Sequence, residues 1–161
     1  MSPPPDITVA AIVVRDQRFL IVEERIAGRN VFNQPAGHVE PGETLLQAVV
    51  RETLEETAWT LRPLALLGVY RWQPPTARRP TLRFAFVGET TAHDPLRRLD
   101  QGILAAHWMT RTELVAATGQ LRSPLVLHCI DDFLAGQRRP LEPFAALDLD
   151  TAASAPALTI A

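Results

Sequence analysis

The stretch from Gly37 to Trp59 reads GHVEPGETLLQAVVRETLEETAW, and it decides how the rest of the chain is interpreted. Neither Gly nor Pro occurs between Thr44 and Thr57. Within it, four residues recur at the spacing of one helix face: Leu46, Val49, Val50 and Thr53. We therefore expect an amphipathic helix that starts at Pro41-Gly42-Glu43, with an acid in its first turn.

The same helix carries three carboxylates on one face. Residues at i, i+3 and i+4 are neighbours, so Glu52, Glu55 and Glu56 point the same way. Each like-charge pair costs about 0.2–0.5 kcal/mol, and a hard divalent cation such as Mg²⁺ reverses that cost. Arg51 is spaced to pair with Glu55, whereas Glu43 can join only if the preceding loop folds back. The alternative is a solvated acidic helix face.

The pattern resembles the Nudix box, which fixes Gly, then Glu after five residues, then Arg-Glu after seven more, followed by Glu-Glu. The chain matches it at Gly37, Glu43, Arg51, Glu52, Glu55 and Glu56. Chance agreement over the chain is on the order of 10⁻⁵. Thr53 replaces an aliphatic residue. Ala58 replaces a Gly that permits a left-handed turn, so the sequence predicts the position of the helix end only to within about one turn.

Flanking stretches resemble the NudJ-type phosphatase branch of that superfamily. They include Asn33-Gln34-Pro35-Ala36-Gly37-His38 and Leu121-Arg122-Ser123-Pro124-Leu125-Val126, and the resemblance covers residues 6–143. It implies an α/β (α+β) fold, an α/β/α sandwich around a central mixed sheet. It also implies a monomer that hydrolyses nucleoside di- and triphosphates and hydroxymethylpyrimidine pyrophosphate, with Mg²⁺ as the cofactor and Mn²⁺ as an alternative.

The resemblance also implies roles for the box residues. Gly37, Glu52, Glu55 and Glu56 would form the metal site, and Arg51 and Glu43 would complete the catalytic set. The general base stays open between Glu52, Glu89 and Asp100. Many relatives carry an acid six residues before the late-strand tryptophan, and here the position before Trp108 is Gly102.

Four residues outside the box are expected to bind substrate: Arg25, Asn33, Trp72 and Arg83. A tryptophan can stack on a base or pyrimidine ring, and arginine suits phosphate. The alternative for Trp72 is packing at a strand end, and for the arginines it is solvation. His128 and Cys129 fall within the last helix and are expected to be core or packing residues.

The other elements follow from hydrophobic patterning and turn residues. We expect strands at Ile7–Val14, Phe19–Val22, Val31–Gln34, Leu64–Trp72, Leu82–Val87 and Ala105–Met109. Thr-Arg-Thr-Glu from Thr110 is a capping box that starts a helix, and Ser123-Pro124 starts a last helix that Gly136 ends. Residues 1–5 are expected to be a flexible leader, 6–143 the domain and 144–161 a weakly structured tail.

Composition excludes several function classes. The 161 residues carry a net charge of −2, so a nucleic-acid partner is not indicated. All 16 basic residues are arginine, which excludes a P-loop and Schiff-base chemistry. The single cysteine excludes a disulfide framework within the chain and favours the cytoplasm. No apolar run suggests a membrane span.

Two rival functions remain open at this point. One is a Nudix hydrolase for ADP-ribose or dinucleoside polyphosphates. The other is a non-catalytic Nudix domain that binds a nucleotide as a sensor. Such sensors typically lose box carboxylates, and this chain keeps all of them.

Overall fold

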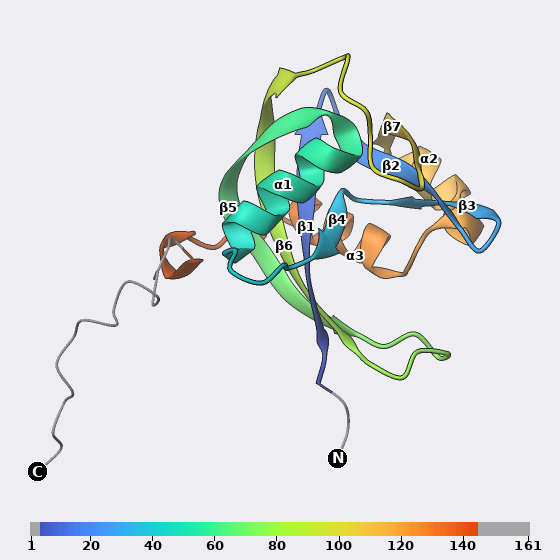
Figure 1. Cartoon of the computed structure of the whole chain (residues 1–161), viewed down its shortest axis with the longest axis horizontal. Coiled ribbons are helices and arrows are strands. Elements are labelled where there is room, and N and C mark those ends of the chain that lie inside the picture. Colours follow the sequence, from blue (N-terminus) through green and yellow to red (C-terminus); the bar gives the residue numbers. More distant parts are fainter. Residues whose placement is uncertain (1–3, 145–161) are drawn as a thin grey trace, which may run out of the picture.

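A computed structural model describes residues 4–144 (Figure 1). Its strands are β1 (Asp6–Arg15), β2 (Arg18–Ile26), β3 (Arg29–Asn33), β4 (Ala36–His38), β5 (Trp59–Trp72), β6 (Thr81–His93) and β7 (Ile103–Thr110). Its helices are α1 (Leu45–Thr57), α2 (Arg111–Ala116) and α3 (Leu125–Leu134), with short 3₁₀ turns η1 (Thr118–Gln120) and η2 (Glu142–Phe144).

The seven strands form one mixed sheet, as predicted. The order is β3-β2-β1-β6-β5, with β4 on β1 and β7 on β2. Only β1 and β6 run parallel, in register from Asp6 opposite Thr81 to Val13 opposite Gly88, and the other pairs are antiparallel. This pairing brings β1 to the middle of the sheet, where both of its faces are covered.

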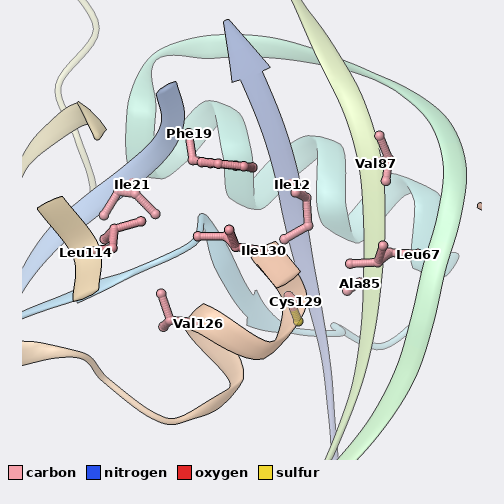
Figure 2. Packing of buried hydrophobic residues seen from close by; sticks show 10 residues of the cluster. All are labelled: Ile12, Phe19, Ile21, Leu67, Ala85, Val87, Leu114, Val126, Cys129 and Ile130. Atoms are coloured by element: carbon pink, nitrogen blue, oxygen red, sulfur yellow. The ribbon is translucent and has the colours of Figure 1, made fainter. Parts of the chain in front are cut away.

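Helices cover the sheet on two sides, which gives the predicted α/β/α sandwich. Val9, Ala11 and Val13 of β1 pack with Val49 of α1. Ile12 belongs to the opposite cluster, whose other members include Leu67, Ala85, Val126, Cys129 and Ile130 (Figure 2). Since successive strand residues point to opposite faces, Thr8 also faces the α3 side.

Helix α1 begins later than predicted. Thr44 is the N-cap, because its hydroxyl accepts from the Gln47 N–H while the Gln47 side chain accepts from the Thr44 N–H. Glu43 therefore precedes the helix, and no acid lies in the first turn. The helix ends at Thr57, because Ala58 itself takes the left-handed conformation with φ 60°. Thr53 fits the core by donating to the Val49 carbonyl at 2.7 Å.

Other predicted features hold, with some differences at element ends. The hairpin turn at Asp16-Gln17 and the capping box between Thr110 and Glu113 are both present. Strands β5 and β6 are longer than predicted, because they pair with each other along most of their length, including their polar ends. His128 is exposed and so lies outside the core, but its ring packs edge-on against Tyr70 with centroids 5.5 Å apart, whereas Cys129 is fully buried.

The structure does not cover the whole predicted tail. Phe144, the first residue of that segment, packs on Phe84 and Phe86, with ring centroids 6.2 and 5.9 Å away. The predictions for residues 1–3 and 145–161 lie outside the described residues. Between residues 4 and 144, none of the helices has the length and apolarity needed to cross a membrane.

Candidate active site

The short strand β4 places Gly37 directly against the carboxylate helix. Ala36, Gly37 and His38 pair with residues 8–10 of β1, which fixes this backbone beside α1. A Cβ atom at Gly37 would overlap the carboxylate of Glu52. Only glycine therefore allows Glu52 to lie in this position, which gives a physical reason for the first residue of the box motif.

Arg51 joins the acidic residues around it. Its Nη1 donates to Glu52 at 2.9 Å and to Glu55 at 3.0 Å, and its Nη2 donates to Glu43 at 2.6 Å and to the His38 carbonyl at 3.0 Å. The hydrogen bond to Glu43 is the main reason that the pKa of Arg51 is raised, and it lowers the pKa of Glu43. The loop before α1 thus folds back as the sequence required, and Glu43 joins the site.

Two carboxylates of the helix are held in a poorly hydrated setting. Glu56 is 8% exposed and accepts from the Ala36 N–H at 2.8 Å. Burial raises its pKa to about 8 despite that hydrogen bond. Burial also raises the pKa of Glu52, and it outweighs the opposing effect of Arg51. Both side chains would be stabilised in the charged form by a nearby cation.

These residues fit a divalent metal ion in their donor chemistry. They offer carboxylate oxygens, the ligands that hard cations prefer, and a cation would offset the cost of charging these carboxylates where they are buried. Within residues 4–144, no three acidic, histidine or cysteine side chains already converge as a ligand cage. Instead, Arg51 holds Glu52 and Glu55, while Glu56 binds the Ala36 N–H.

The structure separates the two predicted base candidates outside the helix. Asp100 donates its backbone N–H to the Glu55 carbonyl at 3.0 Å, and its charge raises the pKa of both Glu52 and Glu56. Glu89 instead pairs with Arg62. Its neighbour Gly88 lies beside Val13, four residues along β1 from the partner of Gly37, which is roughly 13 Å.

A cavity of about 570 Å³ borders this region on the α3 side. Three of the four predicted substrate residues line it: Asn33, Trp72 and Arg83. Arg25 does not line the cavity. Its side chain is exposed on β2, and its backbone N–H donates to the Gly102 carbonyl at 2.8 Å.

Sequence reasoning missed other polar residues of the same cavity, among them Thr8, Glu24, Arg122 and Ser123. One signal was available for Glu24, because it is an acid in a strand whose second to fifth residues are apolar and buried. Ser123 was interpreted only as a helix start. Nothing in the local sequence connects positions 8, 24, 83 and 123, since the sheet and α3 bring them together.

Comparison with known proteins gives concordant matches. The NUDIX domain family model matches residues 4–128. Phosphatase NudJ of Escherichia coli K12 is 41% identical over 138 residues, which cover 86% of this chain and 89% of that protein. A NUDIX hydrolase structure from Nitrosomonas europaea is 43% identical with a TM-score of 0.87, and the match covers 89% of this chain and 98% of that chain.

A more distant structure shares the fold alone. The NUDIX domain of Shewanella oneidensis NrtR, complexed with ADP ribose, is 17% identical with a TM-score of 0.62. The match covers 82% of this chain and 88% of that chain.

Proposed function

The chain belongs to the Nudix family and is a hydrolase acting on pyrophosphate bonds, and we propose that it hydrolyses nucleoside di- and triphosphates and hydroxymethylpyrimidine pyrophosphate with Mg²⁺. One observation supports this most directly. The half-buried Glu52 and the buried Glu56 contact Gly37 and Ala36, two residues that line a polar cavity containing Arg83. The proposed residues for the cation and the proposed cavity for the organic part of the substrate are therefore next to each other.

Nudix hydrolases generally use divalent metals. In this chain the proposed site for Mg²⁺, or alternatively Mn²⁺, consists of Glu52, Glu55 and Glu56 together with the adjacent Gly37. When bound, the ion supplies neutralisation of phosphate charge and activation of water. The oxygen-only donor set suits Mg²⁺ and Mn²⁺.

The remaining residues position these carboxylates and handle protons. Arg51 orients Glu52 and Glu55 through hydrogen bonds of 2.9 and 3.0 Å, and Glu43 holds Arg51 from the other side. Glu52 and Asp100 are the proposed proton acceptors for the attacking water. Asp100 is favoured over Glu89 because it is tied to α1 at the Glu55 carbonyl, whereas Glu89 pairs with Arg62.

The organic part of the substrate is assigned to the cavity lined by Asn33, Trp72 and Arg83. A net charge of −2 gives no reason to expect nucleic acid as a partner. A single buried cysteine suits a reducing cytoplasm. A monomer is inferred from the resemblance to NudJ-type phosphatases.

The decisive experiment is a substrate panel with product identification. Purified protein and Mg²⁺ are incubated with GTP, hydroxymethylpyrimidine pyrophosphate, ADP-ribose and a dinucleoside polyphosphate. Orthophosphate from GTP indicates attack at the terminal phosphate, and a mononucleotide indicates internal attack. Preferential turnover of ADP-ribose or the dinucleoside would replace the proposed substrates with the rival ones, and no turnover over the whole panel would favour a sensor.

The variant Glu56→Gln tests the proposed metal ligand in the same assay. It should abolish turnover while the fold stays intact by circular dichroism, because the amide keeps the shape and loses the charge. Glu142→Gln, at an exposed acid in η2, is the matched control and should retain wild-type rates. Activity of Glu56→Gln at ordinary Mg²⁺ would remove Glu56 from the ligand set.

A further inference from the structure

The cavity beside the carboxylate helix gathers buried polar atoms that have no partner within the protein. Residues 4–144 contain seven such side-chain atoms, and six of them belong to cavity-lining residues. The six are Thr8 Oγ1, Glu24 Oε1, Asn33 Oδ1, Arg83 Nε, Arg83 Nη1 and Ser123 Oγ. The seventh, Gln34 Oε1, lies outside this lining.

Four of these five side chains are deeply buried and Glu24 is half-buried, so bulk water does not explain their hydrogen bonding. Thr8, Asn33, Arg83 and Ser123 are 8, 6, 7 and 5% exposed. Glu24 has Arg122 as an ion-pair partner, but at 3.9 Å the contact is too long for a hydrogen bond. Unpaired buried polar groups destabilise a fold, and their concentration at one cavity indicates that a ligand satisfies them.

The mixture of donors and acceptors restricts that ligand. Arg83 offers N–H donors, whereas Glu24 Oε1 and Asn33 Oδ1 are acceptors. A phosphate group carries acceptors only, so it would leave Glu24 Oε1 without a hydrogen-bond donor and facing a like charge. A planar heterocycle with a ring nitrogen or oxo group next to an amino group satisfies both kinds of partner.

The position of the group fits the organic end of a substrate. Arg83 lies opposite Thr8 across β6 and β1, and Thr8 lies opposite His38 across β1 and β4. Two strand spacings, roughly 10 Å, therefore separate Arg83 from the backbone next to Gly37. Trp72, half-buried at the end of β5, adds an aromatic surface to the same cavity.

We propose that Arg83, Glu24 and Asn33, with Trp72 as a stacking surface, recognise a planar nitrogen heterocycle through an edge that carries an acceptor next to an amino donor. Glu24 accepts from the amino group, and Arg83 donates to the acceptor. The inference rests on the proposed function, in which this ring is the organic group of the phosphoanhydride substrate. Purine nucleotides and aminopyrimidine diphosphates share the required chemistry.

The first test measures binding without catalysis. Adenosine, and purine riboside, which lacks only the amino group, are titrated into the protein with excess chelator, and tryptophan fluorescence is recorded. Adenosine should bind about 10-fold more tightly than purine riboside, and Glu24→Gln should reduce that preference to below about threefold. The quenching should disappear in Trp72→Phe, because the ring stacks there. Equal preference in wild type and Glu24→Gln would overturn the role of Glu24.

The second test measures turnover with Mg²⁺ on ATP, purine riboside triphosphate, hydroxymethylpyrimidine pyrophosphate and inorganic tripolyphosphate, which has no ring. Arg83→Met should lower kcat/KM for the ring-containing substrates by about 10- to 100-fold and change that for tripolyphosphate less than about threefold. A uniform loss over all substrates would overturn ring recognition by Arg83. The ring-containing substrate with the highest wild-type kcat/KM identifies the source of the heterocycle.

Two controls keep the results interpretable. Arg83→Met removes an unpaired buried charge, so its melting temperature should equal or exceed that of the wild type. Arg111→Gln removes the α2 arginine of an exposed ion pair with Asp131 of α3, and it should leave the turnover of every substrate unchanged. If adenosine preference survives in chelator while no substrate is hydrolysed, ring recognition stands and the proposed hydrolytic substrates fail.

Discussion

The carboxylate of Glu52 lies so close to the backbone of Gly37 that any side chain at position 37 would overlap it. The contact joins β4 to α1 at the point where the carboxylate face of the helix begins. It links a backbone requirement to the chemistry of the site. Several consequences can be measured.

Gly37→Ala should displace Glu52 and lower kcat by about 100-fold, since a shift of about 1 Å in a catalytic site has that effect. The free energy of unfolding should fall by no more than about 1 kcal/mol, because the overlap is with the far end of a flexible side chain. Steady-state kinetics and urea denaturation measure the two effects. Gly119→Ala is the control, because a Cβ there meets nothing within 4 Å. Wild-type activity in Gly37→Ala would show that Glu52 can relax without loss.

Arg51→Lys should lower kcat/KM by about 10- to 100-fold, the usual effect of losing a residue that orients metal ligands. A lysine keeps the charge but cannot contact Glu43, Glu52 and Glu55 together in the planar geometry of a guanidinium. The Mg²⁺ concentration giving half-maximal rate should rise in the same assay. Arg62→Lys, at an exposed pair with Glu89, should change neither quantity.

Removal of divalent cations should make stability depend on pH through Glu56. Its pKa is about 8 in the fold against an ordinary value of 4.5. The contribution of the neutral acid is fully present below about pH 4.5 and is lost as pH rises through about 8. In chelator, the melting temperature should therefore fall from pH 5.5 to pH 9, and Mg²⁺ at pH 9 should raise it.

Glu56→Gln should flatten this pH dependence, because the amide does not titrate. The two melting curves, wild type and variant, are compared in the same chelator-containing buffers. Identical slopes in both proteins would assign the pH dependence to other groups.

Gln17→Gly should stabilise the protein by about 0.5–1 kcal/mol. Asp16 and Gln17 form a two-residue hairpin turn with φ of 48° and 61°, and a left-handed non-glycine residue costs about 1–2 kcal/mol. The greater freedom of glycine in the unfolded chain offsets part of the gain. Chemical denaturation measures the change. Gln120→Gly, which relieves no positive φ, should lower stability, and a loss in Gln17→Gly would refute the strain argument.

Local patterns predicted most elements because their causes are local. The capping box at Thr110 and the hairpin turn at Asp16-Gln17 depend on residues within a few positions of each other. The predicted helix start at Pro41-Gly42-Glu43 is wrong because Thr44 and Gln47 form a capping box, and the side chain of Glu43 binds Arg51 instead. Ala58 could not be assigned from sequence, since its left-handed φ depends on the strand that follows the helix at once.

The sequence by itself determined the carboxylate array, because helical periodicity fixes which side chains of a 13-residue helix share a face. It also determined that Glu43 could take part only through a folded loop. Only the tertiary structure decided the surroundings of that array. It places Gly37 against Glu52 and ties Asp100 to α1, and it gathers Thr8, Glu24 and Arg83 around one cavity. Those positions come from β1–β6 pairing and sheet–helix packing between residues far apart in the chain, and no local spacing encodes such contacts.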